Sequence, residues 1–62
     1  MYYIYNKHSR NVLATTNDFS SVGTLMTNWD HTEYVESSVE IPYKYQGHWI
    51  VNEQGQVENI MD

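Results

Sequence analysis

The residues of this chain that could carry out chemistry are three histidines, eight carboxylates and a few serines. The histidines are His8, His31 and His48, and none of them has a second histidine at the i, i+4 spacing that places two ligands on one helix face. A structural or catalytic zinc site uses three or four converging protein ligands. The spacing therefore indicates histidines that are exposed or make one hydrogen bond, and we expect neither a metal site nor a cofactor.

Nucleophilic catalysis has no recognisable constellation in the chain. There is no cysteine, and the serine pairs 20–21 and 37–38 lie in no glycine elbow. The three glycines are isolated and cannot form a phosphate-binding loop. A chain of 62 residues also leaves little volume for a substrate pocket of about 300–1,000 Å³. We therefore expect that the protein is not an enzyme.

Carboxylates concentrate in the segment 33–40, where the sequence alternates as a strand does. Glu36 and Glu40 share one side of this expected strand with Tyr34, and Glu33 lies just upstream. At about 3.3 Å per residue, Glu36 and Glu40 are about 13 Å apart, too far for the carboxylate pair of a glycosidase. An acidic row can imitate a phosphate backbone and engage a basic cleft. The alternative is a solvated face that keeps an edge strand from pairing.

A second candidate contact is the aromatic segment "IPYKYQGHW", residues 41–49. Trp49 lies two positions before Val51 on an expected strand and should face inward with it. Tyr43 and Tyr45 share one side of an extended loop, and tyrosine is enriched at interface hot spots. We therefore interpret these two rings as exposed contacts, with a loop packed over the sheet edge as the alternative.

The elements that must position these residues form the order β-β-α-β-β-β. The expected elements are strands at 2–7, 12–16 and 32–41, a helix over about 17–29, and a hairpin of strands 48–52 and 56–60. Gly55 suits the tight turn of that hairpin. The order predicts an α+β fold in which one antiparallel sheet of four to five strands carries one α-helix on one face.

The expected helix has a continuous apolar stripe. Its members recur at intervals of three and four residues: Phe19, Val22, Leu25, Met26 and Trp29. Asn17 or Asp18 can cap the first turn. Gly23 lies in the middle, either because the helix approaches the sheet closely there or because it is simply a weak point.

Length and charge restrict the partners. The chain is long enough for one domain, residues 1–62, and its formal charge is −5 from three bases against eight acids. So few bases make direct nucleic-acid binding unfavourable, whereas a protein with a basic surface is electrostatically complementary. No apolar run approaches the roughly 20 residues of a membrane span, and no signal peptide is visible. We expect a cytoplasmic protein.

In its size, acidity and lack of cysteine the chain resembles the small proteins of bacteriophages and other mobile elements. This resemblance implies an inhibitor that binds and disables a host protein. The first hypothesis is therefore a non-enzymatic protein-binding module that occludes a basic surface. Its expected contact residues are Glu33, Tyr34, Glu36, Glu40, Tyr43 and Tyr45. The alternatives are a homo-oligomeric assembly protein, such as a homodimer paired through a strand edge, and a stacking platform for sugars or single-stranded nucleic acid.

Overall fold

A computed structural model describes residues 1–40 and 49–60 of the chain. The described residues form five strands, one 3₁₀ turn and one short α-helix. In chain order these are β1 (Tyr2–Asn6), β2 (Val12–Thr16), η1 (Phe19–Ser21), α1 (Val22–Met26), β3 (Thr32–Glu36), β4 (Trp49–Val51) and β5 (Val57–Asn59). The mixture of helix and antiparallel strands agrees with the predicted α+β class.

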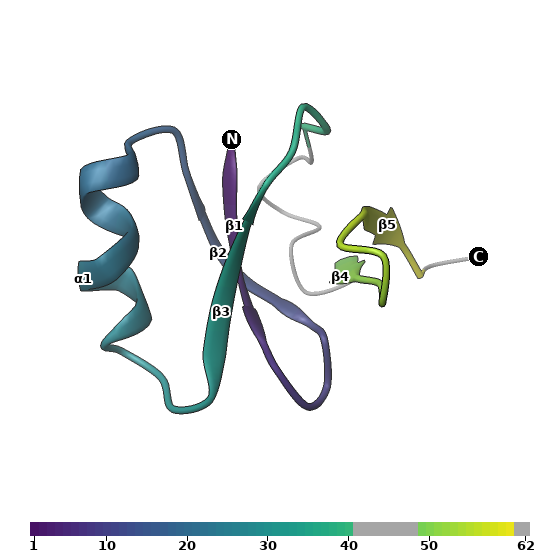
Figure 1. Cartoon of the computed structure of the whole chain (residues 1–62), viewed down its shortest axis with the longest axis horizontal. Helices are drawn as coiled ribbons and strands as arrows, with labels where there is room; N and C mark the ends of the chain where they lie inside the picture. The colour runs from purple at the N-terminus through teal and green to yellow at the C-terminus, as the bar shows by residue number, and fades with distance from the viewer. Residues whose placement is uncertain (41–48, 61–62) are drawn as a thin grey trace.

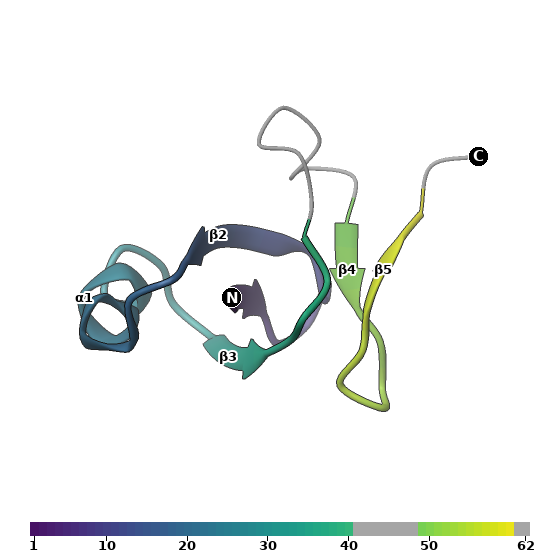
Figure 2. The ribbon, with the colours of Figure 1, turned by 90° about the horizontal axis from the view of Figure 1, so that it is seen from above.

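The strands belong to two antiparallel sheets, not to the single sheet that was predicted. One sheet has the order β2-β1-β3, and the other is the β4-β5 hairpin. Figures 1 and 2 show three layers, with α1 on one side of the three-stranded sheet and the hairpin on the other. The prediction of one sheet was wrong because the hairpin buries its apolar face against the first sheet and, within the described residues, meets its edge only at an isolated bridge between Asn11 and Ile50.

Strand β1 lies at the centre of the three-stranded sheet and is covered on both faces. Its side chains alternate, so Tyr3 and Tyr5 face the hairpin while Tyr2 and Ile4 face the helix. Tyr3 and Ile4 are completely buried. The aromatic and β-branched composition that predicted this strand therefore fills the space on both sides of it.

The larger core lies between the sheet and the hairpin. It consists of Tyr3, Tyr5, Val12, Val51 and Val57, and Met1, Val35 and Trp49 pack partly buried against it. The expectation that Trp49 faces inward is confirmed, although its indole N–H is buried and finds no acceptor within residues 1–40 and 49–60. Gly55 has φ of +80° in the hairpin turn, as a tight connection requires.

Arg10 links the two sheets. Its Nε donates to the Val51 carbonyl at 2.8 Å, and Nη2 donates to the Asn52 carbonyl. The guanidinium carbon lies 4.9 Å from the centroid of the Tyr5 ring, within the range of a cation–π contact. A backbone bond from the Val51 amide to the Arg10 carbonyl, 2.9 Å long, completes the junction.

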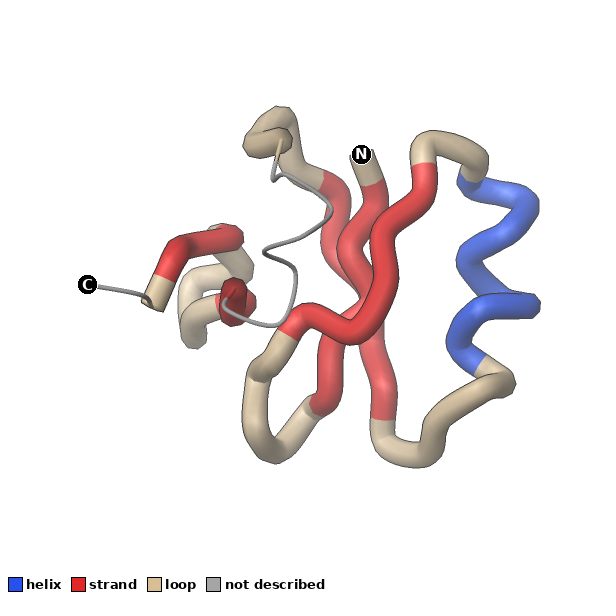
Figure 3. Tube along the Cα trace, turned by 180° about the vertical axis from the view of Figure 1, so that it is seen from behind, coloured by secondary structure: helices blue, strands red, loops and turns tan. Residues whose placement is uncertain are grey.

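The helix is much shorter than its sequence pattern predicts. Asp18 caps it as expected by accepting from the Ser20 amide, but the first turn is 3₁₀ and the α-helix ends at Met26. Only Val22 is buried, and the helix stands alone on its side of the sheet (Figure 3). A side chain at Gly23 would meet nothing within 4 Å, so the expected close approach is wrong. No helix in the described ranges is long and apolar enough to cross a membrane.

Strand β3 also ends early, at Glu36 and not at Ile41. The Ser37 amide still bonds the Met1 carbonyl at 3.0 Å, but the Ser37 hydroxyl then accepts from the Val39 amide at 3.1 Å. Such a local side-chain bond turns the backbone away from ladder pairing. The buried Tyr3 hydroxyl donates to the Val39 carbonyl and holds the chain that follows the strand.

Candidate protein-binding surface

Three aromatic rings meet on the helix side of the sheet: Tyr2 from β1, Phe19 from η1 and Tyr34 from β3. We call this group the aromatic triad. Ring centroids lie 5.3 Å apart for Tyr2–Phe19, 5.8 Å for Phe19–Tyr34 and 6.3 Å for Tyr2–Tyr34, all with tilted or edge-to-face planes. Phe19 remains 57% exposed and Tyr34 45% exposed. The triad is therefore internally packed and also open to solvent.

Strand register and the helix cap together build this group. Tyr34 lies opposite Ile4 on the neighbouring strand, and the next residue of β1 on that face is Tyr2. Asp18 caps the start of η1, and this turn places Phe19 beside the rings of Tyr2 and Tyr34. Hydrogen bonds from Ser20 to the Asp18 carboxylate lower the pKa of that group, so the cap stays ionised at neutral pH. A helix of five residues is too short to cover the rings.

A carboxylate borders the triad. Glu36 pairs directly opposite Tyr2 in the β1-β3 ladder and is exposed. Partial burial raises the pKa of Tyr2 above its ordinary value, and the nearby Glu36 carboxylate raises it further. The surface thus combines apolar rings with an adjacent negative charge.

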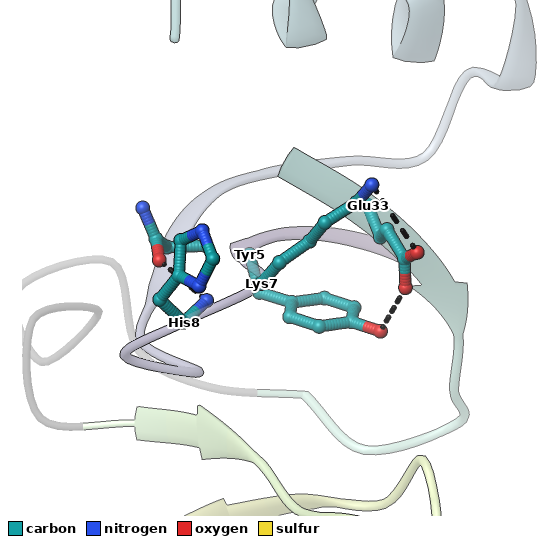
Figure 4. Close-up of polar contacts among 5 residues, drawn as sticks. Tyr5, Lys7, His8 and Glu33 are labelled. Carbon is teal, nitrogen blue, oxygen red and sulfur yellow. Dashed lines mark hydrogen bonds and ion pairs between the residues drawn. The ribbon is translucent and has the colours of Figure 1, made fainter. Parts of the chain in front are cut away.

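Glu33 lies on the opposite face of β3 from Glu36, because neighbouring strand residues point to opposite sides. The Tyr5 hydroxyl donates to Glu33 Oε2 at 3.1 Å, and Lys7 Nζ lies 3.8 Å from Glu33 Oε1 (Figure 4). Burial and the bond to Glu33 raise the pKa of Tyr5. Glu33 therefore has internal partners on the hairpin side.

The predicted acidic row is consequently not one row. Of its members, Tyr34 and Glu36 share a face, Glu33 faces away, and Glu40 lies beyond the end of the strand. Glu40 is exposed, and its charge adds to burial in raising the pKa of Tyr3. The other two predicted contacts, Tyr43 and Tyr45, lie outside the described residues.

Sequence reasoning did not single out Tyr2 and Phe19 as surface residues. Phe19 was assigned to the buried stripe of a long helix, and Tyr2 to a strand face. One signal was available: Ser20, Ser21, Gly23 and Thr24 make the segment after Phe19 a poor helix former. A helix too short to bury its first aromatic residue leaves that residue exposed.

Both basic side chains of the described residues are engaged within the molecule. Lys7 pairs with Glu33, and Arg10 is bonded to the backbone of the hairpin. Neither base makes its ion pair or hydrogen bonds with Glu36 or Glu40, so within the described residues no lysine or arginine neutralises these two carboxylates. The formal net charge of −5 also shows that carboxylates outnumber bases in the chain.

The described part of the chain shows no feature of a small-molecule site. Residues 1–40 and 49–60 enclose no pocket and contain no group of three or more potential metal ligands. Comparisons with protein-family models, with curated proteins and with solved structures found no match to the chain. Any inference about function therefore depends on the surface itself.

Proposed function

We propose that the protein is a non-enzymatic binding module that docks the aromatic triad and Glu36 against a basic surface of another protein. The observation that supports this is the exposed, mutually packed ring cluster beside the exposed Glu36 carboxylate, which no lysine or arginine of the described residues neutralises. Large apolar side chains are usually buried, and a contiguous exposed group of them is typical of an interaction site.

The packing of the rings favours tight contact with a partner. Each ring of the triad already touches the other two, so docking would order few additional side-chain rotamers. Aromatic side chains supply much of the binding energy at protein interfaces, especially where they lie at the centre of the patch. Phe19, the most exposed large apolar residue among residues 1–40 and 49–60, is the expected central contact.

Charge on the proposed surface would orient the partner and increase the rate of association. Glu36 and Glu40 contribute to the net charge of −5, and the bases among the described residues, Lys7 and Arg10, have partners within the molecule. Complementary charge on the partner would accelerate encounter and set the register of docking. The mechanism is occlusion in the cytoplasm, as the compositional resemblance to small inhibitors of mobile elements suggests, with Tyr43 and Tyr45 as additional contacts.

The test is a quantitative capture experiment with matched variants. The tagged chain is used to retain proteins from lysate, and the retained partner is then purified and titrated at low and high salt. Phe19→Ser and Tyr34→Ser should each weaken binding by at least about tenfold, the loss of a hot-spot contact. Ile60→Ser removes an apolar residue from outside the triad whose exposure, 51%, lies between those of Tyr34 and Phe19, and it should leave affinity unchanged.

The acidic component has its own control. Glu36→Gln should weaken binding and reduce its salt dependence, whereas Glu58→Gln, on the exposed side of β5, should do neither. If the triad variants bind as well as the wild type, the proposed surface is wrong. A melting temperature that rises with protein concentration, together with an empty capture, would favour the homo-oligomer instead.

A further inference from the structure

Two histidines that are 23 positions apart in the sequence lie side by side beyond the end of β1. The ring centroids of His8 and His31 are 5.0 Å apart, with an interplanar angle of 64°. Both residues are exposed. They lie at the far end of β1 from Tyr2, because Asn6 pairs with Thr32 at one end of the ladder and Tyr2 pairs with Glu36 at the other.

The backbone around both histidines is held by specific bonds. The Lys7 amide donates to the His31 carbonyl at 2.7 Å, which joins the two turns directly. The His8 amide donates to the Asn6 side-chain oxygen at 2.8 Å, which closes the turn after β1 (Figure 4). His31 has φ of +58°, a conformation that few residues other than glycine adopt. The fold therefore holds the backbones of the two residues next to each other, which keeps their side chains within reach of one another.

We propose that His8 and His31 together bind one divalent late transition-metal ion, such as Zn²⁺, with water in the remaining positions. Imidazole nitrogen is a preferred ligand of these ions. Two imidazoles that share a tetrahedral zinc ion through Zn–N bonds of about 2.0–2.1 Å have ring centroids about 5 Å apart. The observed separation matches that value, so the ion needs only side-chain rotation and no movement of the backbone.

The surroundings favour a cation over an anion. Lys7, the base next to His8 in the sequence, is paired with Glu33, and the whole chain carries a net charge of −5. A negatively charged protein raises the local concentration of cations. Since the described residues offer no third ligand, the site is open and exchanges its metal readily.

The rival explanation is simple edge-to-face packing of two rings, which also gives centroids near 5 Å. The two explanations differ in one measurable property, the affinity for metal. Zn²⁺ is titrated into the full chain, with heat followed by calorimetry and the imidazole signals of each histidine followed by NMR. We expect one Zn²⁺ ion per chain, and the signals of His8 and His31 should shift together along one binding curve.

The variants are His8→Gln, His31→Asn and, as a matched control, His48→Gln. Asparagine tolerates positive φ, so His31→Asn preserves the turn. Each of the first two should weaken Zn²⁺ binding by at least about tenfold, equivalent to about 1.4 kcal/mol, while His48→Gln should retain it. The thermal midpoint of each variant without metal verifies that it is folded.

Three results would overturn the proposal. One is the absence of binding at Zn²⁺ concentrations up to about 1 mM, the weak limit of a specific site. Another is unchanged affinity in a folded His8→Gln or His31→Asn variant. The third is an equal loss in His48→Gln, which would place the ligands elsewhere. None of these variants alters the aromatic triad, so the result is independent of the proposed protein-binding function.

Discussion

The two faces of the three-stranded sheet are covered by different elements and to different extents. On one face the β4-β5 hairpin encloses Tyr3, Tyr5 and Val12 in a continuous core. On the other face α1 buries Val22, while Phe19 and Tyr34 remain about half exposed. Hairpin strands present an apolar side chain at every second position, whereas a helix of five residues offers little more than one turn.

This difference separates a closed face from an open one. The hairpin face contains the larger buried cluster, with the fully buried Tyr3 and Val51 and the Arg10 junction, whereas Ile4 is the fully buried side chain on the helix face. The helix face contains rings that pack on each other and still contact solvent. The aromatic residues on the helix face can remain exposed because the other face is closed by the hairpin.

The strongest test of this comparison replaces one tyrosine on each face. Tyr3→Ala should destabilise the fold by about 3–5 kcal/mol, since it empties a completely buried aromatic site. Tyr34→Ala should cost about 1 kcal/mol or less, because it removes only partly exposed ring contacts. Denaturant unfolding followed by circular dichroism measures both. Equal losses would show that the two faces contribute equally.

Two glycines provide a second contrast, with effects of opposite sign. Gly55→Ala should destabilise the hairpin by about 1–2 kcal/mol, since φ of +80° is unfavourable for a residue with a Cβ. Gly23→Ala should stabilise by about 0.4–1 kcal/mol, because the new methyl group meets nothing within 4 Å and the helix gains propensity. The thermal midpoints of both variants, compared with that of the wild type, measure these two changes in stability. Destabilisation by Gly23→Ala would mean that the helix packs more closely than described.

The partners of Glu33 allow a finer comparison within the hairpin face. Tyr5→Phe removes a hydrogen bond from a buried ring and should cost about 0.5–1.5 kcal/mol. Lys7→Met removes an ion pair whose side chains are about half exposed and should cost less than about 0.5 kcal/mol. A larger effect for Lys7 than for Tyr5 would contradict the assignment of Glu33 to the core side.

The last expected effect is a gradual loss of stability in alkali. Burial raises the pKa of Tyr2, Tyr3 and Tyr5 above the ordinary value of 10.0, and nearby carboxylates add to the shift. Tyrosines in the unfolded chain therefore lose their protons first, so the contribution of these tyrosines to the free energy of unfolding should be constant below about pH 9 and should fall as pH rises past about 10.

Denaturant unfolding midpoints across this pH range measure how stability depends on pH. Tyr5→Phe should make the loss of stability with rising pH less steep. The same tyrosine is thus tested twice, once for its hydrogen bond at neutral pH and once for its ionisation. A stability that rises between about pH 9 and 11 would contradict the direction of the shifts.

Several elements were determined by local sequence. The alternation and composition of residues 2–6 and 12–16, the Asp18 cap and the positive φ of Gly55 each follow from the preferences of a few neighbouring residues. The inward position of Trp49 follows from its spacing to Val51. For these features the physical cause lies within one strand, turn or helix end, and a single chain is enough to predict it.

Only the tertiary structure decided how the elements share their surfaces. Periodicity predicted that Phe19 was buried, yet no partner long enough to cover it exists on that face. It placed Glu36 and Glu40 on one side of a single strand, whereas the strand ends at Glu36 and the Ser37 turn separates the two. His8 and His31 became neighbours through a long-range backbone bond. Burial and adjacency depend on which faces meet, and hydrophobic contact is non-directional, so sequence periodicity shows which residues can be buried but not which partner buries them.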